Sequence, residues 1–322
     1  MVIRKTSALV ESGILAAIAT VFTIIGAYVP ILSLIANFVW PLPIILCGRR
    51  HGLKWSFLCL MVAGIIASIL ISPIHALSVV AVFGIIGLTM GECMRRQMSP
   101  IKLMLVSSVG AFFSFIISML IGYLLMHINI LEVFLDSMSQ GFDMSIDFYR
   151  QMGYGADQLA QITTEMDTMK KMVQMIMPIA FIMVAPVTVF VNYWAARKIL
   201  SKLGDYYPWF PAFSQWSMPR YTLLPYGVSL ILLMQFNSRQ EHPMYQFAFN
   251  LFVFSNVLLI IQALALIYWY IETKGKPRWW FSVCFVIIFI SQFISQIAVL
   301  LGAYDLLFDF RHRKPKTKNG TQ

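Results

Sequence analysis

Three side chains in apolar surroundings have residue types that could hold a small ligand. Asn37 and Trp40 come just before a Pro-Leu-Pro sequence, which prevents a regular helical hydrogen-bond ladder at that point. Backbone groups freed by such an interruption need a polar partner, and discontinuous helices therefore often line binding sites. His75 follows Pro73 in an expected outer turn. We expect Asn37, Trp40 and His75 to contact a ligand; the alternative is a packed kink and an interfacial histidine.

Small residues in the first apolar stretch indicate a second kind of site, a face for helix docking. A spacing of four places residues on one stripe of a helix. Small side chains let helix backbones approach closely where lipid offers no hydrophobic driving force. The stripe could dock onto another protein or pack inside the same bundle. Its members are Ala8, Ser12, Ala16 and Thr20, with Gly13 and Ala17 beside them.

Motifs for catalysis or metal binding are not found in the sequence. It has no glycine-rich phosphate loop, no His-Glu-x-x-His, no Gly-x-Ser-x-Gly and no Cys-x-x-Cys. The four cysteines lie in or beside apolar stretches, where buried thiols are common. We therefore predict that the protein is not an enzyme and has no catalytic residue, metal site or cofactor.

The elements that must position these residues are long apolar stretches. Of 322 residues, 59% are hydrophobic and only 12% are charged, and the mean hydropathy is +0.76. A soluble domain carries about 25% charged residues, so the composition excludes the soluble classes. A stretch of about 20 apolar residues crosses a bilayer as a helix, which satisfies its own backbone. Nine stretches stand out: 8–29, 31–47, 53–72, 74–91, 103–126, 172–196, 221–236, 245–271 and 279–304.

The predicted fold class is therefore all-α, a polytopic transmembrane helical bundle with eight to nine hydrophobic segments. The formal net charge is +10, but the Lys and Arg residues gather in short loops beside apolar segments. This pattern is typical of membrane insertion rather than of nucleic-acid binding. The lipid bilayer is the expected partner, and no nucleic acid is expected.

The loop charges predict the orientation. With a cytoplasmic N-terminus, the inner loops hold 15 basic residues and the outer loops hold four. Nine full crossings would place the basic tail 311–322 outside, against this rule. We therefore expect that either 221–236 or 279–304 does not cross fully, the latter being re-entrant or broken near Gly302 and Asp305. Both termini are then cytoplasmic.

The domain organisation follows from a polar, aromatic stretch that begins near residue 200. We predict a six-helix membrane domain over 1–200, additional membrane helices over 201–310 and a basic cytoplasmic tail over 311–322. The first domain includes an outer loop, 127–171, which holds half of the 14 acidic residues. Within it, 157–171 is expected to be a helix that continues into the sixth segment.

Glycine and proline spacing in the first six segments resembles the S components of energy-coupling-factor transporters. Besides the small stripe, the resemblance rests on Pro43, Gly48, Gly52, Gly64, Pro73, Gly84, Gly87 and Gly91. It implies that the first segment docks onto a transmembrane coupling protein, with ATP hydrolysis supplied by separate subunits. The whole chain resembles the YybS-like membrane proteins of bacteria, including the sequences at 301–305 and 308–311. This implies a multi-pass protein of the bacterial cytoplasmic membrane.

Two functions are compatible with these features. The first is a small-molecule-binding or uptake subunit of the S-component type. The alternative is a membrane scaffold or regulatory protein without transport activity, which the extra segments and the charged loops favour.

Overall fold

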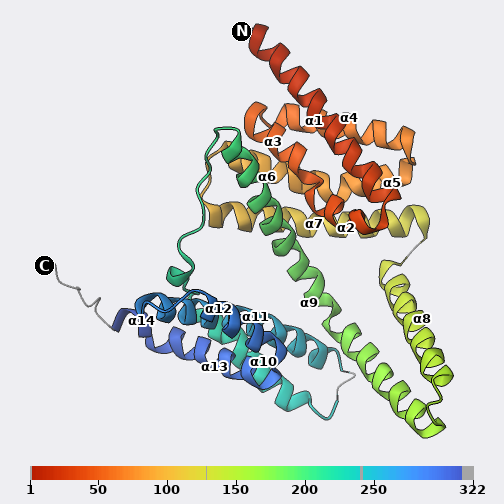
Figure 1. Cartoon of the computed structure of the whole chain (residues 1–322), viewed down its shortest axis with the longest axis vertical. Helices are drawn as coiled ribbons and strands as arrows, with labels where there is room; N and C mark the ends of the chain where they lie inside the picture. The colour runs from red at the N-terminus through yellow and green to blue at the C-terminus, as the bar shows by residue number, and fades with distance from the viewer. Residues whose placement is uncertain (1, 128, 240–241, 314–322) are drawn as a thin grey trace, which may run out of the picture. The chain divides into compact units, whose positions relative to one another are not determined.

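The computed structural model describes residues 2–127, 129–239 and 242–313, and within these ranges it contains helices and connecting segments but no strand. Contacts divide the chain into two compact units. Unit 1 comprises residues 1–171 and 180–209, and unit 2 comprises residues 172–179 and 210–322. Figure 1 shows the helices of both units, coloured along the chain from red at the N-terminus to blue at the C-terminus.

Unit 1 contains nine helices among the described residues. They are α1 (Val2–Tyr28), α2 (Pro30–Val39), α3 (Pro41–His51), α4 (Leu53–Leu70), α5 (Pro73–Val79), α6 (Ile85–Arg95), α7 (Pro100–Met126), α8 (Ile130–Gln151) and most of α9 (Ala156–Lys202). A π-helical turn, Val80–Gly84, joins α5 to α6. Proline in the first turn of α2, α3, α5 and α7 marks their starts, because its missing N–H is not needed there.

The centre of unit 1 is α3, which contacts α1, α4 and α6. Its residues 41–48 are all buried. A Cβ added at Gly91 of α6 would lie 3.0 Å from the carbonyl oxygen of Ile45 and 3.1 Å from the Cα of Gly48. A Cβ at Gly87 would lie 2.8 Å from the Cβ of Ile44. These glycines allow the close backbone approach by which helices associate in lipid.

Unit 2 is built around α11 (Pro243–Thr273). The other helices are α10 (Leu223–Phe236), α12 (Trp279–Ile290), α13 (Gln292–Phe308) and α14 (Phe310–Arg313), and two 3₁₀ turns, Phe213–Gln215 and Arg220–Thr222, precede α10. α13 runs parallel to α11: Gly302 meets Leu259, and further along the ring of Phe310 lies 6.3 Å from that of Trp269. The end of α13 therefore lies toward the C-terminal end of α11 (Figure 1).

Among the described residues, six helical segments are long and apolar enough to cross a membrane, and the α12–α13 pair would be a seventh if it formed one span. This confirms the predicted all-α, polytopic helical membrane protein, in which six or seven of the expected segments are long enough to span as helices. The expected segment 31–47 is broken at Trp40 into helices of 10 and 11 residues, and α10 has only 14 residues. The last segment is bent by 115° between α12 and α13. The bend lies at Ser291, and Gly302 and Asp305 lie inside α13 instead of at the break expected there.

The expected outer loop at 127–171 is mostly helical. Its second half is a helix continuous with the sixth segment, as predicted, because α9 begins at Ala156 and runs for 47 residues. Its first half forms α8, which the sequence analysis treated as loop. The break between the two helices is the Gly153-Tyr154-Gly155 turn, where Gly153 has a φ of 88°.

Candidate functional site

Trp40 lies at the break between α2 and α3, and it is buried there. It is 1% exposed, and its indole Nε1 donates a hydrogen bond of 2.8 Å to Oγ1 of Thr23 in α1. Its ring lies 6.1 Å from that of Phe83 in the π-helical turn. The single polar atom of the Trp40 side chain is thus already bonded within unit 1.

In the part of the chain that the structure describes, no contact of Asn37 or His75 with the Trp40 side chain is seen. The side chain of Asn37 lies outside the described residues, although its backbone is part of α2. His75 is in the first turn of α5, where its backbone N–H donates to Oγ of Ser72 at 3.2 Å. His75 precedes Phe83, whose ring lies beside that of Trp40, by eight residues. These eight residues correspond to about 12 Å of helix. A combined site of Asn37, Trp40 and His75 therefore stays a prediction.

The small-residue stripe of α1 divides into an inner and an outer part. Ala8, Ser12, Ala16 and Thr20 are buried within unit 1, and Oγ of Ser12 lies 3.3 Å from Sγ of Cys47 in α3. These four residues pack inside the chain's own bundle, which is the alternative that the sequence analysis left open. Gly13 and Ala17 are exposed, and a Cβ at Gly13 would meet nothing within 4 Å.

Arg49 contacts residues from several loops at one end of unit 1. Its guanidinium donates to both carboxylate oxygens of Asp205, at 2.8 and 2.9 Å, and to the carbonyl of Met94 at 2.7 Å. It also lies over the ring of Tyr207, 5.8 Å from the centroid. These contacts bring the ends of α3 and α6 together with the segment that follows α9. Three of the predicted inner loops thus lie at the same end of the unit.

Tyr207 fixes the same segment. Its hydroxyl donates to the carbonyl of Met98, and its own carbonyl accepts a 3.0 Å hydrogen bond from Nε of Arg197. Tyr207 is 3% exposed. Burial raises the pKa of this phenol to about 12, because the phenolate would lose its hydration; Cys93 adds to the effect and Arg49 opposes it. The phenol is therefore a neutral hydrogen-bond donor at physiological pH.

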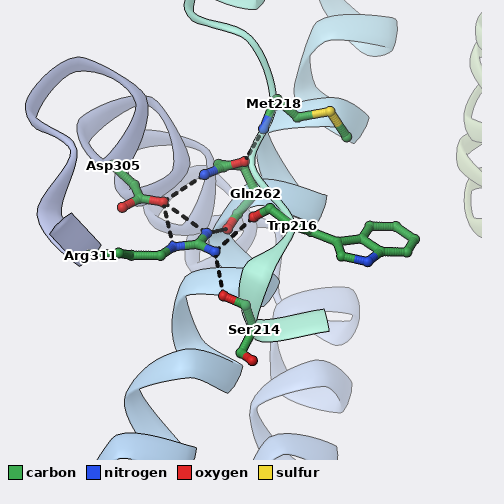
Figure 2. A network of polar contacts seen from close by, with 6 residues as sticks. All are labelled: Ser214, Trp216, Met218, Gln262, Asp305 and Arg311. Carbon is green, nitrogen blue, oxygen red and sulfur yellow. Dashed lines mark hydrogen bonds and ion pairs between the residues drawn. The ribbon is translucent and has the colours of Figure 1, made fainter. Parts of the chain in front are cut away.

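The most buried ion pair among the described residues lies in unit 2 and joins Asp305 of α13 to Arg311 of α14 (Figure 2). The two side chains are 3% and 9% exposed, and Nη2 of Arg311 lies 2.9 Å from Oδ2 of Asp305. Nε2 of Gln262 in α11 donates to the same oxygen at 2.6 Å. The other carboxylate oxygen, Oδ1, is buried and has no hydrogen-bond partner in the described structure.

This network provides hydrogen-bond partners for backbone groups of the irregular segment that precedes α10. Arg311 donates to the carbonyls of Ser214 and Trp216, at 2.8 and 2.7 Å, and the N–H of Met218 donates to Oε1 of Gln262 at 2.8 Å. Figure 2 shows the guanidinium between the carboxylate and these carbonyls. Buried backbone groups that cannot reach water need protein partners. The network therefore supports the extended segment that precedes the short helix α10.

The sequence analysis missed both of these clusters. It assigned Arg311 to a basic tail over 311–322, whereas this residue is buried in an ion pair. It ended the last segment at residue 304, but α13 continues to Phe308 and buries Asp305. The available signal was one acidic residue at the edge of an apolar segment with an arginine six residues later, since intramembrane ionisable residues need a partner. No three His, Cys, Asp or Glu side chains of the described residues form a potential metal site.

Comparisons with known proteins agree with this architecture. The family model "Predicted membrane protein (DUF2232)" matches residues 17–306. A protein of Bacillus subtilis (strain 168), described as "Uncharacterized protein YybS", is 24% identical over 310 residues, which cover 96% of this chain and 99% of the relative. No solved structure matches the chain.

Proposed function

We propose a scaffolding or regulatory function, without transport activity, for this chain, which belongs to the DUF2232 family of predicted membrane proteins. The observation that carries the proposal is the burial of Trp40, whose indole N–H is bonded to Thr23. The side chain best placed to hold a ligand at the helix break instead joins α1 to the start of α3. Because the polar group at the helix break holds two helices of the bundle together, it stabilises a framework. Binding to other molecules is then left to the outer faces of the helices.

The exposed face of α1 is the proposed docking site for another membrane protein. Gly13 and Ala17 are one helical turn apart on this face, with the exposed side chains of Val10, Ile14 and Val21 around them. A pair of small residues four apart allows a partner helix to come close, which is the usual geometry of helix pairs in lipid. For the second candidate, an uptake subunit, the S-component resemblance implies that the partner on this face is a transmembrane coupling protein with separate ATPase subunits.

Photo-crosslinking from Ile14, which is 57% exposed, tests this face. A photoreactive amino acid at this position in the cell should give one discrete protein adduct. The double variant Gly13→Leu/Ala17→Leu should lose the adduct, because the larger side chains keep the partner backbone away. The matched control Gly13→Ala/Ala17→Ser keeps the residues small and should retain it. Adducts with lipid alone, or an adduct that the leucine variant retains, would contradict the proposal.

A small-molecule-binding subunit is the second candidate, and one observation favours it. The helix break at Trp40 touches the π-helical turn through Phe83, and both interrupted helices and π turns are frequent at functional sites. Native mass spectrometry of the purified protein distinguishes the candidates. A metabolite that stays bound without a partner protein and that raises the melting temperature on addition supports binding, whereas a protein without such a ligand supports scaffolding.

For orientation, we propose that the basic end of each unit faces the cytoplasm. In unit 1 this end carries Arg49, Arg95 and Arg96 together with the last turn of α9. In unit 2 it is the C-terminal end of α11, toward which the parallel helix α13 also leads. The excess of Lys and Arg in cytoplasmic loops supports both assignments. A reporter fused after residue 322 that is active only outside the cytoplasm would overturn the second assignment.

A further inference from the structure

The acidic side chains and the large exposed apolar side chains of α8 lie on different faces of the helix. At about 100° per residue, four acidic residues fall within an arc of about 60°. All four are exposed; they are Glu132, Asp136, Asp143 and Asp147. We call them the acidic face. Such sorting is not needed for a connecting loop and is typical of a helix at a boundary between two media.

A second face of α8 is apolar and exposed. Its side chains are 50% to 73% exposed and occupy an arc of about 100° next to the acidic face, by the same helical rotation. They are Val133, Phe134, Met144 and Phe148. We call them the apolar face. The remaining side of α8 is half-buried, and from it Oγ of Ser139 accepts a 2.6 Å hydrogen bond from Nζ of Lys170 in α9.

The position of α8 in unit 1 identifies what covers the apolar face. α8 begins four residues after the end of α7, a helix whose last turns expose Tyr123, Leu124 and Leu125 as a lipid-facing helix does. It then turns away from the direction of α7 instead of extending it (Figure 1). Because α7 is long and apolar enough to cross a membrane, its end, and with it the start of α8, lies at the membrane surface.

We propose that α8 lies in the membrane interface on the side opposite the basic end of unit 1, with its apolar face in the lipid and its acidic face in water. Amphipathic helices bind this boundary through the area of their apolar face. Since the polar face is acidic, attraction to anionic headgroups does not contribute, and the binding depends on the apolar side chains. α8, which forms a hairpin with the first half of α9, then rests on the bilayer instead of projecting into water.

Fluorescence quenching in single-copy nanodiscs tests this placement. A polarity-sensitive fluorophore is attached to Phe134→Cys or Met144→Cys on the apolar face, and to Asp136→Cys or Asp143→Cys on the acidic face. The background carries Cys284→Ser, because the other three cysteines are buried. Doxyl-labelled phosphatidylcholine should quench the apolar-face labels at least twofold more strongly than the acidic-face labels, and aqueous iodide should show the reverse order.

Two results would overturn the proposal. Equal quenching of both faces by iodide would mean that the hairpin projects into water. Protection of the apolar-face labels from both quenchers would mean that protein covers this face, either a second copy or a partner. Two label positions on each face keep the result independent of any single substitution, and size-exclusion chromatography confirms that each labelled protein is folded and monodisperse.

Discussion

Replacing Arg311 with methionine should strongly destabilise unit 2. Methionine keeps the length and apolar bulk of the side chain but removes every N–H donor. The change leaves the carboxylate of Asp305, which is 3% exposed, with Nε2 of Gln262 as its hydrogen-bond donor among the described residues. It also removes the donor to the carbonyls of Ser214 and Trp216.

The expected loss can be estimated from these contacts. Removing one partner of a buried ion pair costs about 3–5 kcal/mol, because an uncompensated charge remains buried. Each buried carbonyl left without a donor costs about 1–3 kcal/mol when it cannot reach water. Because groups that share one hydrogen-bond network do not contribute additively, we expect a total of about 4 kcal/mol rather than the full sum.

The assay is reversible unfolding in mixed micelles with increasing sodium dodecyl sulfate, followed by tryptophan fluorescence. Arg220, which is exposed, provides the control variant Arg220→Met. The double variant Asp305→Leu/Arg311→Met completes a mutant cycle. It should lose about 2 kcal/mol less than the sum of the single losses, because the two side chains interact directly. A loss below about 1 kcal/mol for Arg311→Met, or strictly additive losses, would refute the reasoning.

Three further outcomes are expected. Trp40→Phe removes the N–H bonded to Thr23 and leaves a cavity where the larger ring was buried, so the free energy of unfolding should fall by about 2 kcal/mol; an unchanged unfolding midpoint would contradict this packing and this bond. Arg49→Met should cost about 1–2 kcal/mol, since Asp205 is 31% exposed and partly solvated, and Arg49→Lys, which cannot bind both oxygens, should recover only part of this loss. The pKa of Tyr207 is raised to about 12 from an unfolded value of about 10. The unfolded state therefore loses the proton first, and stability should fall as the pH rises from about 10 to about 12. Tyr207→Phe should show a smaller decline than the unmodified protein, and ultraviolet absorbance of tyrosinate monitors the titration.

The spanning helices could be predicted from sequence because long apolar stretches have one solution in lipid. The break at Trp40 was also predictable, since Pro41 cannot join a continuous hydrogen-bond ladder. The bend at Ser291 was not, because neither proline nor glycine stands there; Oγ of Ser291 caps the new helix by accepting from the N–H of Ile294. Gly302 drew attention as a breaker, but it permits contact with α11: a Cβ there would lie 2.1 Å from the carbonyl oxygen of Leu259.

The candidate sites were less predictable than the helices. Residue types and their spacing indicated Trp40 and the small-residue stripe of α1. They do not show which residues of a helix are covered by neighbouring helices. Ser12 and Gly13 are neighbours, and the structure buries one and exposes the other. The clusters at Arg49 and Arg311 depend on contacts between residues far apart in sequence, 156 positions for Arg49 and Asp205. No local pattern encodes these distant contacts, although Arg311 and its ion-pair partner Asp305 are only six positions apart.

The bonds of Arg311 have a consequence for biogenesis. Its partners Ser214 and Trp216 precede it by 97 and 95 residues, so their carbonyls leave the ribosome long before their donor is made. Until then, the translocon or water must solvate that stretch of chain. Unit 2 therefore completes its assembly only when α14 has been synthesised, and nascent chains arrested before Arg311 should be preferred substrates of membrane quality-control proteases.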